Sequence, residues 1–335
     1  MDSLNISLGV VITLVIVALL FDFMNGFHDA ANSIATIVST RVLKPHHAVI
    51  WAAAFNFLAY FLFQLKVAST IGKGTIDPSI VDHYVIFGAL IGAIIWNIIT
   101  WYYGIPSSSS HALVGGLVGA AVAKAGFGGL ILAGVLKIIA FIFIAPFLGF
   151  VIGGALMVIV SWLCRNMATR KVDKYFRRFQ LISAAAYSLG HGGNDAQKTI
   201  GIIWMLLIAA GISSSNDPIP GWVVFSCYSA MGIGTMFGGW RIVKTMGNRI
   251  TKLNQARGFC ANSGGAVTLF MATALGVPVS TTHTITGAIA GVGSTRGARR
   301  VRWGVAGGIV WAWILTIPCS AAMAALAWYL GRMVL

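Results

Sequence analysis

The stretch GHGGNDAQKTIG, residues 190–201, decides the fold because a related stretch, NGFHDAANSIA, occupies residues 25–35. Aligned on each other, the two stretches place Asp29 opposite Asp195, an offset of 166 residues. Glycine, alanine and isoleucine coincide at further positions of the alignment. A carboxylate therefore stands at the same place in two related parts of the chain.

A second pair of stretches repeats in the same order. PSSSSHALVGGLVG begins at Pro106 and PVSTTHTITGAIAG begins at Pro278, an offset of 172 residues. Two pairs at nearly one spacing indicate a duplicated unit. We expect a first copy over residues 1–164, a basic linker over residues 165–178 and a second copy over residues 179–335.

The composition is that of a membrane protein. Hydrophobic residues make up 58% of the 335-residue chain and charged residues only 9%, whereas soluble domains carry about a quarter charged residues. Long uncharged runs match the roughly 20 residues that a bilayer-spanning helix needs. The sequence therefore predicts an all-α polytopic membrane protein with about ten to twelve membrane segments.

Two apolar runs, residues 131–164 and 303–335, are longer than one perpendicular span. Each is expected to be either a strongly tilted helix or a broken helix with an extra re-entrant turn.

The net charge of +15 is concentrated in short loops. Six of the 23 Lys and Arg lie in residues 165–178, five in residues 241–257 and four in residues 296–302. Basic loops between apolar runs follow the positive-inside rule, so we assign them to the cytoplasmic face of the cell membrane, against anionic lipid headgroups. Nucleic acid is not an expected partner, and both termini are expected outside. The central basic loop is also a candidate docking site for a soluble cytoplasmic regulator.

The same loops give the two copies opposite orientations. After the aspartate stretch, the loop at residues 41–47 is basic, while its equivalent at residues 213–220 contains no Lys or Arg. After the serine/threonine stretch the contrast reverses, because residues 124–129 carry one Lys and residues 296–302 carry four Arg. We therefore expect two inverted-topology repeats with broken or re-entrant helices, an architecture that places a binding site near the midplane.

The serine/threonine stretches are predicted to bind an anion. Pro106 and Pro278 are expected to end the preceding helices, and hydroxyl side chains to cap new ones. Helix N-termini carry free N–H donors and a partial positive charge, and inversion brings two of them to one point. Downstream glycines are expected to allow close helix packing. The predicted ligand is a small oxyanion held by hydroxyl residues: Ser108, Ser109, Ser110, Ser280, Thr281 and Thr282.

The aspartate stretches are predicted to bind a cation or to couple its movement. An ionised carboxylate at membrane depth is energetically costly, so its presence there indicates a function. Asp22, Asp29 and Asn32 fall on one face of a continuous helix. The glycines of these stretches are expected to interrupt the helices and free carbonyl oxygens. Such oxygens suit Na⁺, and a buried aspartate suits a proton. The histidines nearby lack a convergent His/Cys/Glu spacing, so no metal site is expected.

At these stretches the chain resembles, over essentially its full length, the inorganic phosphate transporter (Pit) family, in particular its bacterial low-affinity, PitA-like branch. The motifs NGFHDAANSIAT, GHGGNDAQKTIG, PSSSSHALVG and PVSTTHTITG carry the resemblance. It implies a secondary active symporter that moves inorganic phosphate with a cation by alternating access, without a cofactor, as a homodimer. It also implies a cation or coupling role for Asp29, Asn32, Asp195 and Asp22, and phosphate binding by the six hydroxyl residues together with Asn194 and Lys198.

One position departs from the sodium-coupled members of that family, in which the second copy also has Asn three residues after its Asp. Here the residue is Lys198, within i, i+3 reach of Asp195. We hypothesise that its ammonium group replaces one bound cation or touches the anion directly. This arrangement resembles the bacterial, proton-coupled branch of the family, so H⁺ is favoured as the coupling ion, with Na⁺ at Asp29, Asn32 and Asp195 as the alternative.

Other functions remain open at this point. A sulfate permease of the same family would use a similar tetrahedral oxyanion, and an anion channel would differ only in lacking uphill transport. An intramembrane aspartyl protease needs two carboxyl groups that share a proton. Lys198 would keep Asp195 ionised and the serine/threonine stretches would have no role, so an enzyme is not expected.

Overall fold

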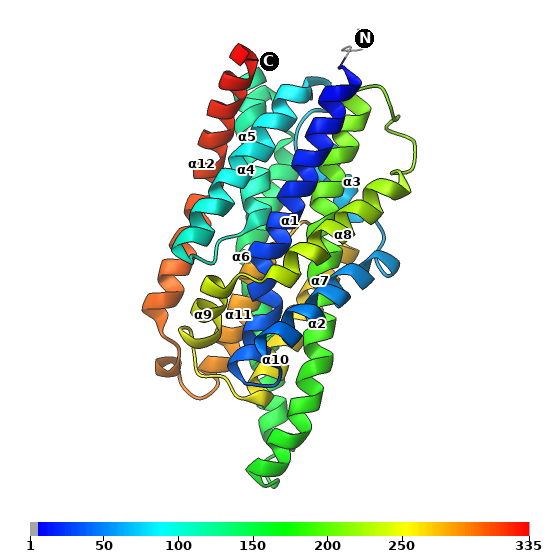
Figure 1. Cartoon of the computed structure of the whole chain (residues 1–335). Coiled ribbons are helices and arrows are strands. Elements are labelled where there is room, and N and C mark those ends of the chain that lie inside the picture. The colour runs from blue at the N-terminus through cyan, green and yellow to red at the C-terminus, as the bar shows by residue number, and fades with distance from the viewer. Residues whose placement is uncertain (1–5, 335) are drawn as a thin grey trace.

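The computed structural model describes residues 6–334, which form long helices joined by short connections (Figure 1). In chain order the α-helices are α1 (Leu8–Ser39), α2 (Pro45–Leu58), α3 (Lys66–Gly74), α4 (His83–Tyr103), α5 (Ser109–Ala125), α6 (Leu132–Leu163), α7 (Thr169–Ala209), α8 (Gly221–Phe237), α9 (Trp240–Asn248), α10 (Gln255–Ala274), α11 (Thr281–Ser294) and α12 (Trp303–Val334).

Within these residues, α1, α4, α5, α6 and α12 are long and apolar enough to cross a membrane. The pair α2 and α3, bent by 78°, adds a sixth span if the two are counted together. The predicted all-α polytopic membrane fold is confirmed. The expected ten to twelve segments exceed these five or six; α8 is apolar but too short for this criterion.

The glycines of the aspartate stretches do not interrupt their helices, so that prediction was wrong. α1 and α7 run unbroken through Gly26 and Gly192. A Cβ at Gly26 would overlap the backbone of Met231 in α8, and a Cβ at Gly192 would overlap the backbone of Asn56 in α2. These glycines permit close helix crossings, which no pattern within a single stretch could indicate.

The two longest apolar runs form single helices. α6 and α12 each contain 32 residues and each carries one internal proline, Pro146 and Pro318. Of the two alternatives from the sequence, the unbroken helix is the one observed.

Two pairs of neighbouring helices form helical hairpins. α4 and α5 form the first, in the upper half of Figure 1, and α10 and α11 form the second, in the lower half. α4 ends at Gly104 and α10 just before Gly276, two glycines with φ of 66° and 67°. These left-handed residues, and not the prolines that follow them, end the helices. An ion pair of 2.7 Å between Asp82 and Lys124 joins the two ends of the first hairpin.

Each hairpin packs mainly against the other copy. α5 lies on α12 and α11 lies on α6. A Cβ at Gly115 would overlap the Ile317 carbonyl of α12, and a Cβ at Gly287 would overlap the Pro146 carbonyl of α6. Close packing at these glycines, which the sequence predicted, is therefore observed, and the two copies interlock.

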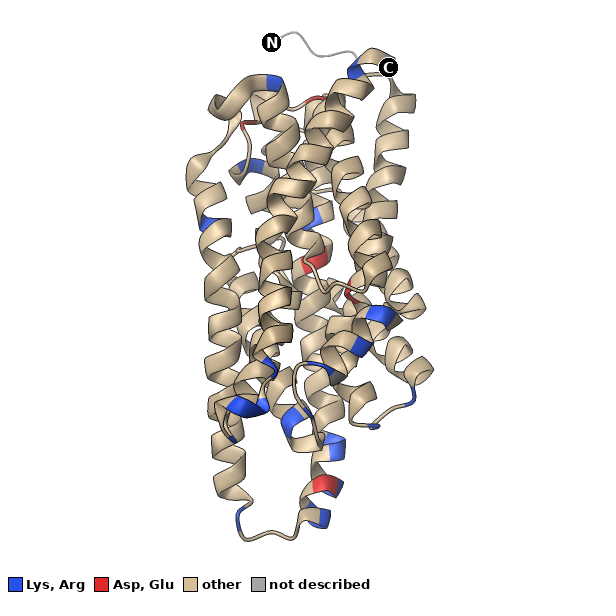
Figure 2. Cartoon of the chain, turned by 90° about the vertical axis from the view of Figure 1, so that its left-hand side faces the viewer, with Lys and Arg blue, Asp and Glu red and all other residues tan. Residues whose placement is uncertain are grey.

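The hydrophobic core has two parts, one toward each end of the molecule, and each part contains residues of both copies. The buried polar segment of α1 around Asp29 lies between them. Lys and Arg gather toward one end, which we call the basic end (Figure 2). α1 begins and α12 ends at the opposite end (Figure 1). Of the expected linker, residues 165–168 lie outside helices, and residues 169–178 are the first turns of α7.

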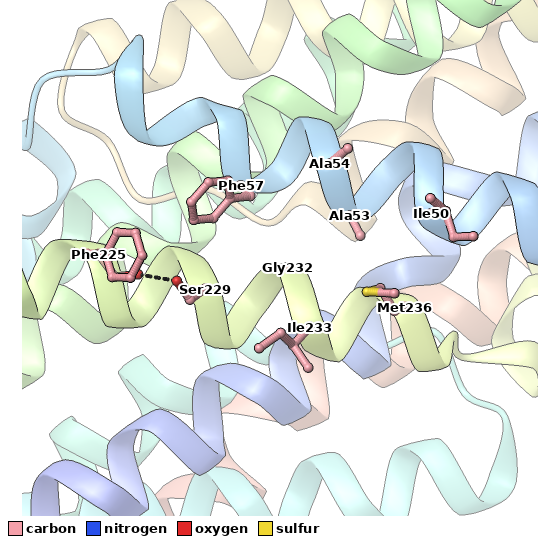
Figure 3. Close-up of a pocket in the computed structure, with 9 residues that line it drawn as sticks. All are labelled: Ile50, Ala53, Ala54, Phe57, Phe225, Ser229, Gly232, Ile233 and Met236. Carbon is pink, nitrogen blue, oxygen red and sulfur yellow. Dashed lines mark hydrogen bonds between the residues drawn. The ribbon is translucent and has the colours of Figure 1, made fainter.

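The outer surface is apolar, as a surface that contacts lipid requires. Figure 3 shows one groove between α2 and α8, with Ile50, Phe57, Phe225 and Met236 along its walls. Ile50, Phe225 and Met236 are each about half exposed, at 53%, 54% and 49%.

Candidate functional site

The tips of the two hairpins meet in the middle of the molecule. α5 and α11 both begin there, and each has a serine at its N-cap, as the sequence predicted. The Ser108 hydroxyl accepts from the His111 N–H and the Ser280 hydroxyl from the His283 N–H, both at 3.2 Å. The imidazole rings of these two histidines lie 4.6 Å apart. Two helix N-termini with free N–H donors therefore converge from opposite ends.

Each aspartate accepts from the hairpin of its own copy. The Ser109 hydroxyl lies 3.3 Å from Asp29 Oδ1, and the Thr281 hydroxyl lies 3.0 Å from Asp195 Oδ2. Ser109 and Thr281 are corresponding residues of the two copies, 172 positions apart. The repeat seen in the sequence is thus also a repeat of contacts.

The residues three positions after each aspartate reach into the opposite copy. The Asn32 amide donates to the hydroxyls of Thr281 and Thr282 at 3.2 and 2.9 Å. The Lys198 ammonium donates to Ser110 of the first hairpin, to Asp195, and to the Val279 carbonyl at 2.8 Å. Lys198 is 1% exposed. It therefore holds a buried positive charge between the two tips, surrounded by three oxygen atoms.

Two histidines lie close to the carboxylates. His28 Nδ1 lies 2.7 Å from Asp29 Oδ1, and its Nε2 lies 3.1 Å from the Thr100 hydroxyl. His191 Nε2 lies 3.2 Å from Asp195 Oδ2, and its Nδ1 lies 3.1 Å from the Asn56 side chain. Sequence reasoning did not include Asn56 or Thr100. In the sequence each of these two residues is only a polar residue inside an apolar run, and such residues are too common to be identified as parts of a site.

Asn194 holds the backbone of the second hairpin. Its amide nitrogen donates to the Thr273 hydroxyl at 3.0 Å and to the Val277 carbonyl at 3.1 Å, and its oxygen accepts from the Val279 N–H at 3.1 Å. These three bonds fix the segment that leads into Ser280. The amide is occupied in shaping the tip, and its predicted contact with phosphate stays a prediction.

Asp22 differs from the other two aspartates because, within residues 6–334, neither of its carboxylate oxygens has a hydrogen-bond partner. Its side chain is fully buried, as is that of Asp195. The side-chain oxygens of Asn25 and Thr199, also buried, lack partners as well. An unpaired carboxylate is costly at this depth unless a proton or a cation joins it.

The twelve predicted site residues are all buried, none exposing more than 4% of its surface. The fold also brings carboxylate or imidazole atoms of Asp29, His191 and Asp195 within 4.8 Å of one another. This convergence, which sequence spacing could not reveal, provides hard oxygen ligands and one imidazole for a cation next to the hydroxyl-rich tips. Such a site, at the contact of two opposed hairpins in a polytopic helical protein, is that of a membrane transporter for a small anion.

Comparison with known proteins identifies the family. Residues 25–324 match the phosphate transporter family. A probable low-affinity inorganic phosphate transporter of Rhizobium meliloti (strain 1021) is 58% identical over 334 residues, covering 100% of both chains. Another of Bacillus subtilis (strain 168) is 47% identical over 333 residues, covering 99% of this chain and 100% of the relative. The chain therefore belongs to the phosphate transporter family, which confirms the predicted class of a transporter rather than an enzyme.

A solved structure supports the same assignment. The sodium-dependent phosphate transporter matches this fold with a TM-score of 0.89 and 26% sequence identity, over 98% of this chain and 100% of that chain. The whole arrangement of helices is thus shared, while three quarters of the residues differ.

Proposed function

We propose that the chain is a secondary active symporter that couples inward movement of inorganic phosphate to protons. The observation that carries this proposal is the placement of Lys198. Its ammonium group contacts Ser110, Asp195 and the Val279 carbonyl, the kind of oxygen environment that would otherwise suit a bound cation. A fixed positive charge there leaves one fewer position for Na⁺.

The charges of the site support coupling to a cation. With Asp29, Asp195 and Lys198 ionised, two carboxylates face one ammonium group, so the cluster is negative before any anion arrives. Phosphate would add further negative charge in a medium of low dielectric constant. Protonation of a carboxylate, or binding of a cation, removes this repulsion, so anion and cation binding favour each other.

Burial of the whole site supports alternating access, because phosphate can reach it only if a hairpin or its packing partner moves. We place the basic end in the cytoplasm by the positive-inside rule, and this puts the start of α1 and the end of α12 outside.

The test is uptake of radiolabelled phosphate into proteoliposomes under a proton gradient alone or a sodium gradient alone. We expect the proton gradient to drive accumulation without sodium. The name of the sodium-dependent phosphate transporter makes Na⁺ the alternative. Uptake that requires sodium would contradict proton coupling. Na⁺ bound at Asp29, Asn32 and Asp195 would then be the coupling ion.

Lys198→Asn is the matched variant for this test, because it restores in the second copy the residue that the first copy has at Asn32. We expect it to acquire sodium dependence or to change the number of cations moved per phosphate. Unchanged ion dependence and stoichiometry would contradict the proposed role of Lys198.

We propose Asp22 as a proton carrier. We expect Asp22→Asn to reduce proton-driven accumulation by about tenfold or more. Exchange of internal for external phosphate should persist, because exchange needs no net proton movement. Both rates are measured in the same proteoliposomes. Asp173→Asn, near the start of α7 and far from the site, is the control and should leave both rates unchanged. Parallel loss of exchange and accumulation would instead indicate a structural role.

Two alternatives are separated by further measurements. Relatives named as phosphate transporters favour phosphate over sulfate, and competition of sulfate with labelled phosphate tests this choice. Accumulation against a phosphate gradient excludes a channel.

A further inference from the structure

A cavity of about 400 Å³ lies at the basic end, away from the transport site. Its walls are the α9–α10 loop, the first turn of α10 and the α11–α12 connection. Besides the Thr251 hydroxyl, it is lined by six basic residues: Lys252, Arg257, Arg296, Arg299, Arg300 and Arg302. Among the described residues, no carboxylate lines it.

These charges have no counter-charge within the part of the chain that the structure describes. In residues 6–334, the ion pairs formed by Lys or Arg are Lys124–Asp82 and Lys198–Asp195, and neither lies in this cavity. One guanidinium nitrogen of Arg257, Nε, is buried without a hydrogen-bond partner, while Nη1 donates to the Lys252 carbonyl at 2.6 Å. Gathering unpaired like charges around one hollow is unfavourable, and a bound anion would relieve the repulsion.

The cavity has a fixed framework. The Thr251 hydroxyl donates to the Arg300 carbonyl at 3.1 Å, and the Arg302 N–H donates to the Ile250 carbonyl at 3.0 Å. A Cβ at Gly293 of α11 would contact both Thr251 and Val301. The two loops are therefore held against each other and against α11. The positive-inside rule requires only that these loops carry positive charge. It does not explain why the two loops together enclose a cavity.

The chemistry of the lining points to phosphate groups. Five of the six cations are Arg, whose planar guanidinium binds phosphate oxygens in pairs. The volume and the number of charges exceed what one phosphate group would use. We propose that the cavity binds a compound with two or more phosphate groups, either a soluble one such as pyrophosphate or the headgroup of a diphosphate lipid. That such a ligand arrives from the cytoplasm rests on the proposed orientation of the basic end.

Bound there, the ligand would join the two ends of the second hairpin. Arg257 lies at the start of α10, and residues 296–302 follow the end of α11. The tip of the same hairpin carries Ser280, Thr281 and Thr282 of the transport site. The cavity is therefore placed to restrict the hairpin whose movement the proposed transport cycle needs.

The test is binding of pyrophosphate to the full-length purified protein in nanodiscs of uncharged phosphatidylcholine, measured by calorimetry. We expect the triple variant R296Q/R299Q/R302Q to bind at least about tenfold more weakly. The control triple R170Q/K174Q/R178Q removes the same charge from the same end of the molecule, outside the cavity, and should stay within about twofold of the unmodified protein. Both triples should still take up phosphate in proteoliposomes, which shows that they fold and separates this test from that of the proposed function.

A second arm identifies the source of the phosphate groups. Cardiolipin is added to the nanodiscs, and lipid that remains with the protein after detergent extraction is quantified. Retention of cardiolipin by the unmodified protein and the control triple, and its loss from the cavity triple, would assign the site to a lipid even if pyrophosphate does not bind. If neither pyrophosphate nor cardiolipin distinguishes the cavity triple from the control triple, the proposal is wrong and these arginines serve membrane orientation alone.

Discussion

Replacing Asp195 with Asn is expected to lower phosphate uptake by about 100-fold, because the carboxylate assigned to cation coupling is lost. It is also expected to destabilise the protein by roughly 3–5 kcal/mol, because removing one partner of a buried ion pair leaves the other charge uncompensated. The ammonium of Lys198 would keep the Ser110 hydroxyl, the Val279 carbonyl and a neutral amide oxygen as acceptors, but no counter-charge. The Thr281 hydroxyl would also lose its carboxylate acceptor. Uptake into proteoliposomes, together with the thermal unfolding midpoint in detergent, measures both consequences.

The double variant D195N/K198N separates stability from function. Removing both charges together avoids an unpaired buried ion, so the unfolding midpoint should recover toward that of the unmodified protein. Uptake should stay low in both variants because the carboxylate is missing. A double variant less stable than the single one would show that the pair does not interact as described.

Gly287→Ala is expected to destabilise the protein by about 1–3 kcal/mol, the cost of forcing extra atoms into a packed interface. The added Cβ would overlap the Pro146 carbonyl of α6, and backbone cannot move as a flexible side chain can. Displacement of α11 would also shift Thr281 and Thr282 at its start, so uptake should fall as well. The unfolding midpoint and the uptake rate are the measurements.

Gly308→Ala in α12 is the matched control. A Cβ there would have no neighbouring atom within 4 Å. Since Ala is favoured over Gly in a helix by up to about 1 kcal/mol, this change should leave the protein unaffected or slightly more stable. Equal losses at both glycines would mean that helix propensity, and not contact with α6, decides the outcome.

The duplication visible in the sequence predicted much of the site. Two copies related by symmetry place their equivalent residues around one shared site, so the alignment of the copies predicts which residues lie close together. If two inverted copies share one site, Asp29 and Asp195 must approach each other, and Ser108 and Ser280 must cap opposed helices. The fold then places these residues together. The reach of Lys198 toward Asp195 followed from helix spacing alone.

What the sequence could not provide were contacts between distant segments. Gly26 and Gly192 look like helix breakers within their own stretches, and only the crossing of α8 and α2 explains why they remain helical. Asn194 stands next to Asp195 in the chain, yet its side chain bonds to residues 273–279 instead of facing the hydroxyls. Residues next to each other in a helix point to different sides of it. The packing of the helix against other segments decides which of these sides faces the site.

The exchange of packing partners between the copies constrains biogenesis. α5 is synthesised before α12, the helix that its glycines contact. Until α12 has been made, the first hairpin lacks its main packing partner. The first copy therefore cannot complete its packing on its own during synthesis, and assembly of the binding site waits for α12.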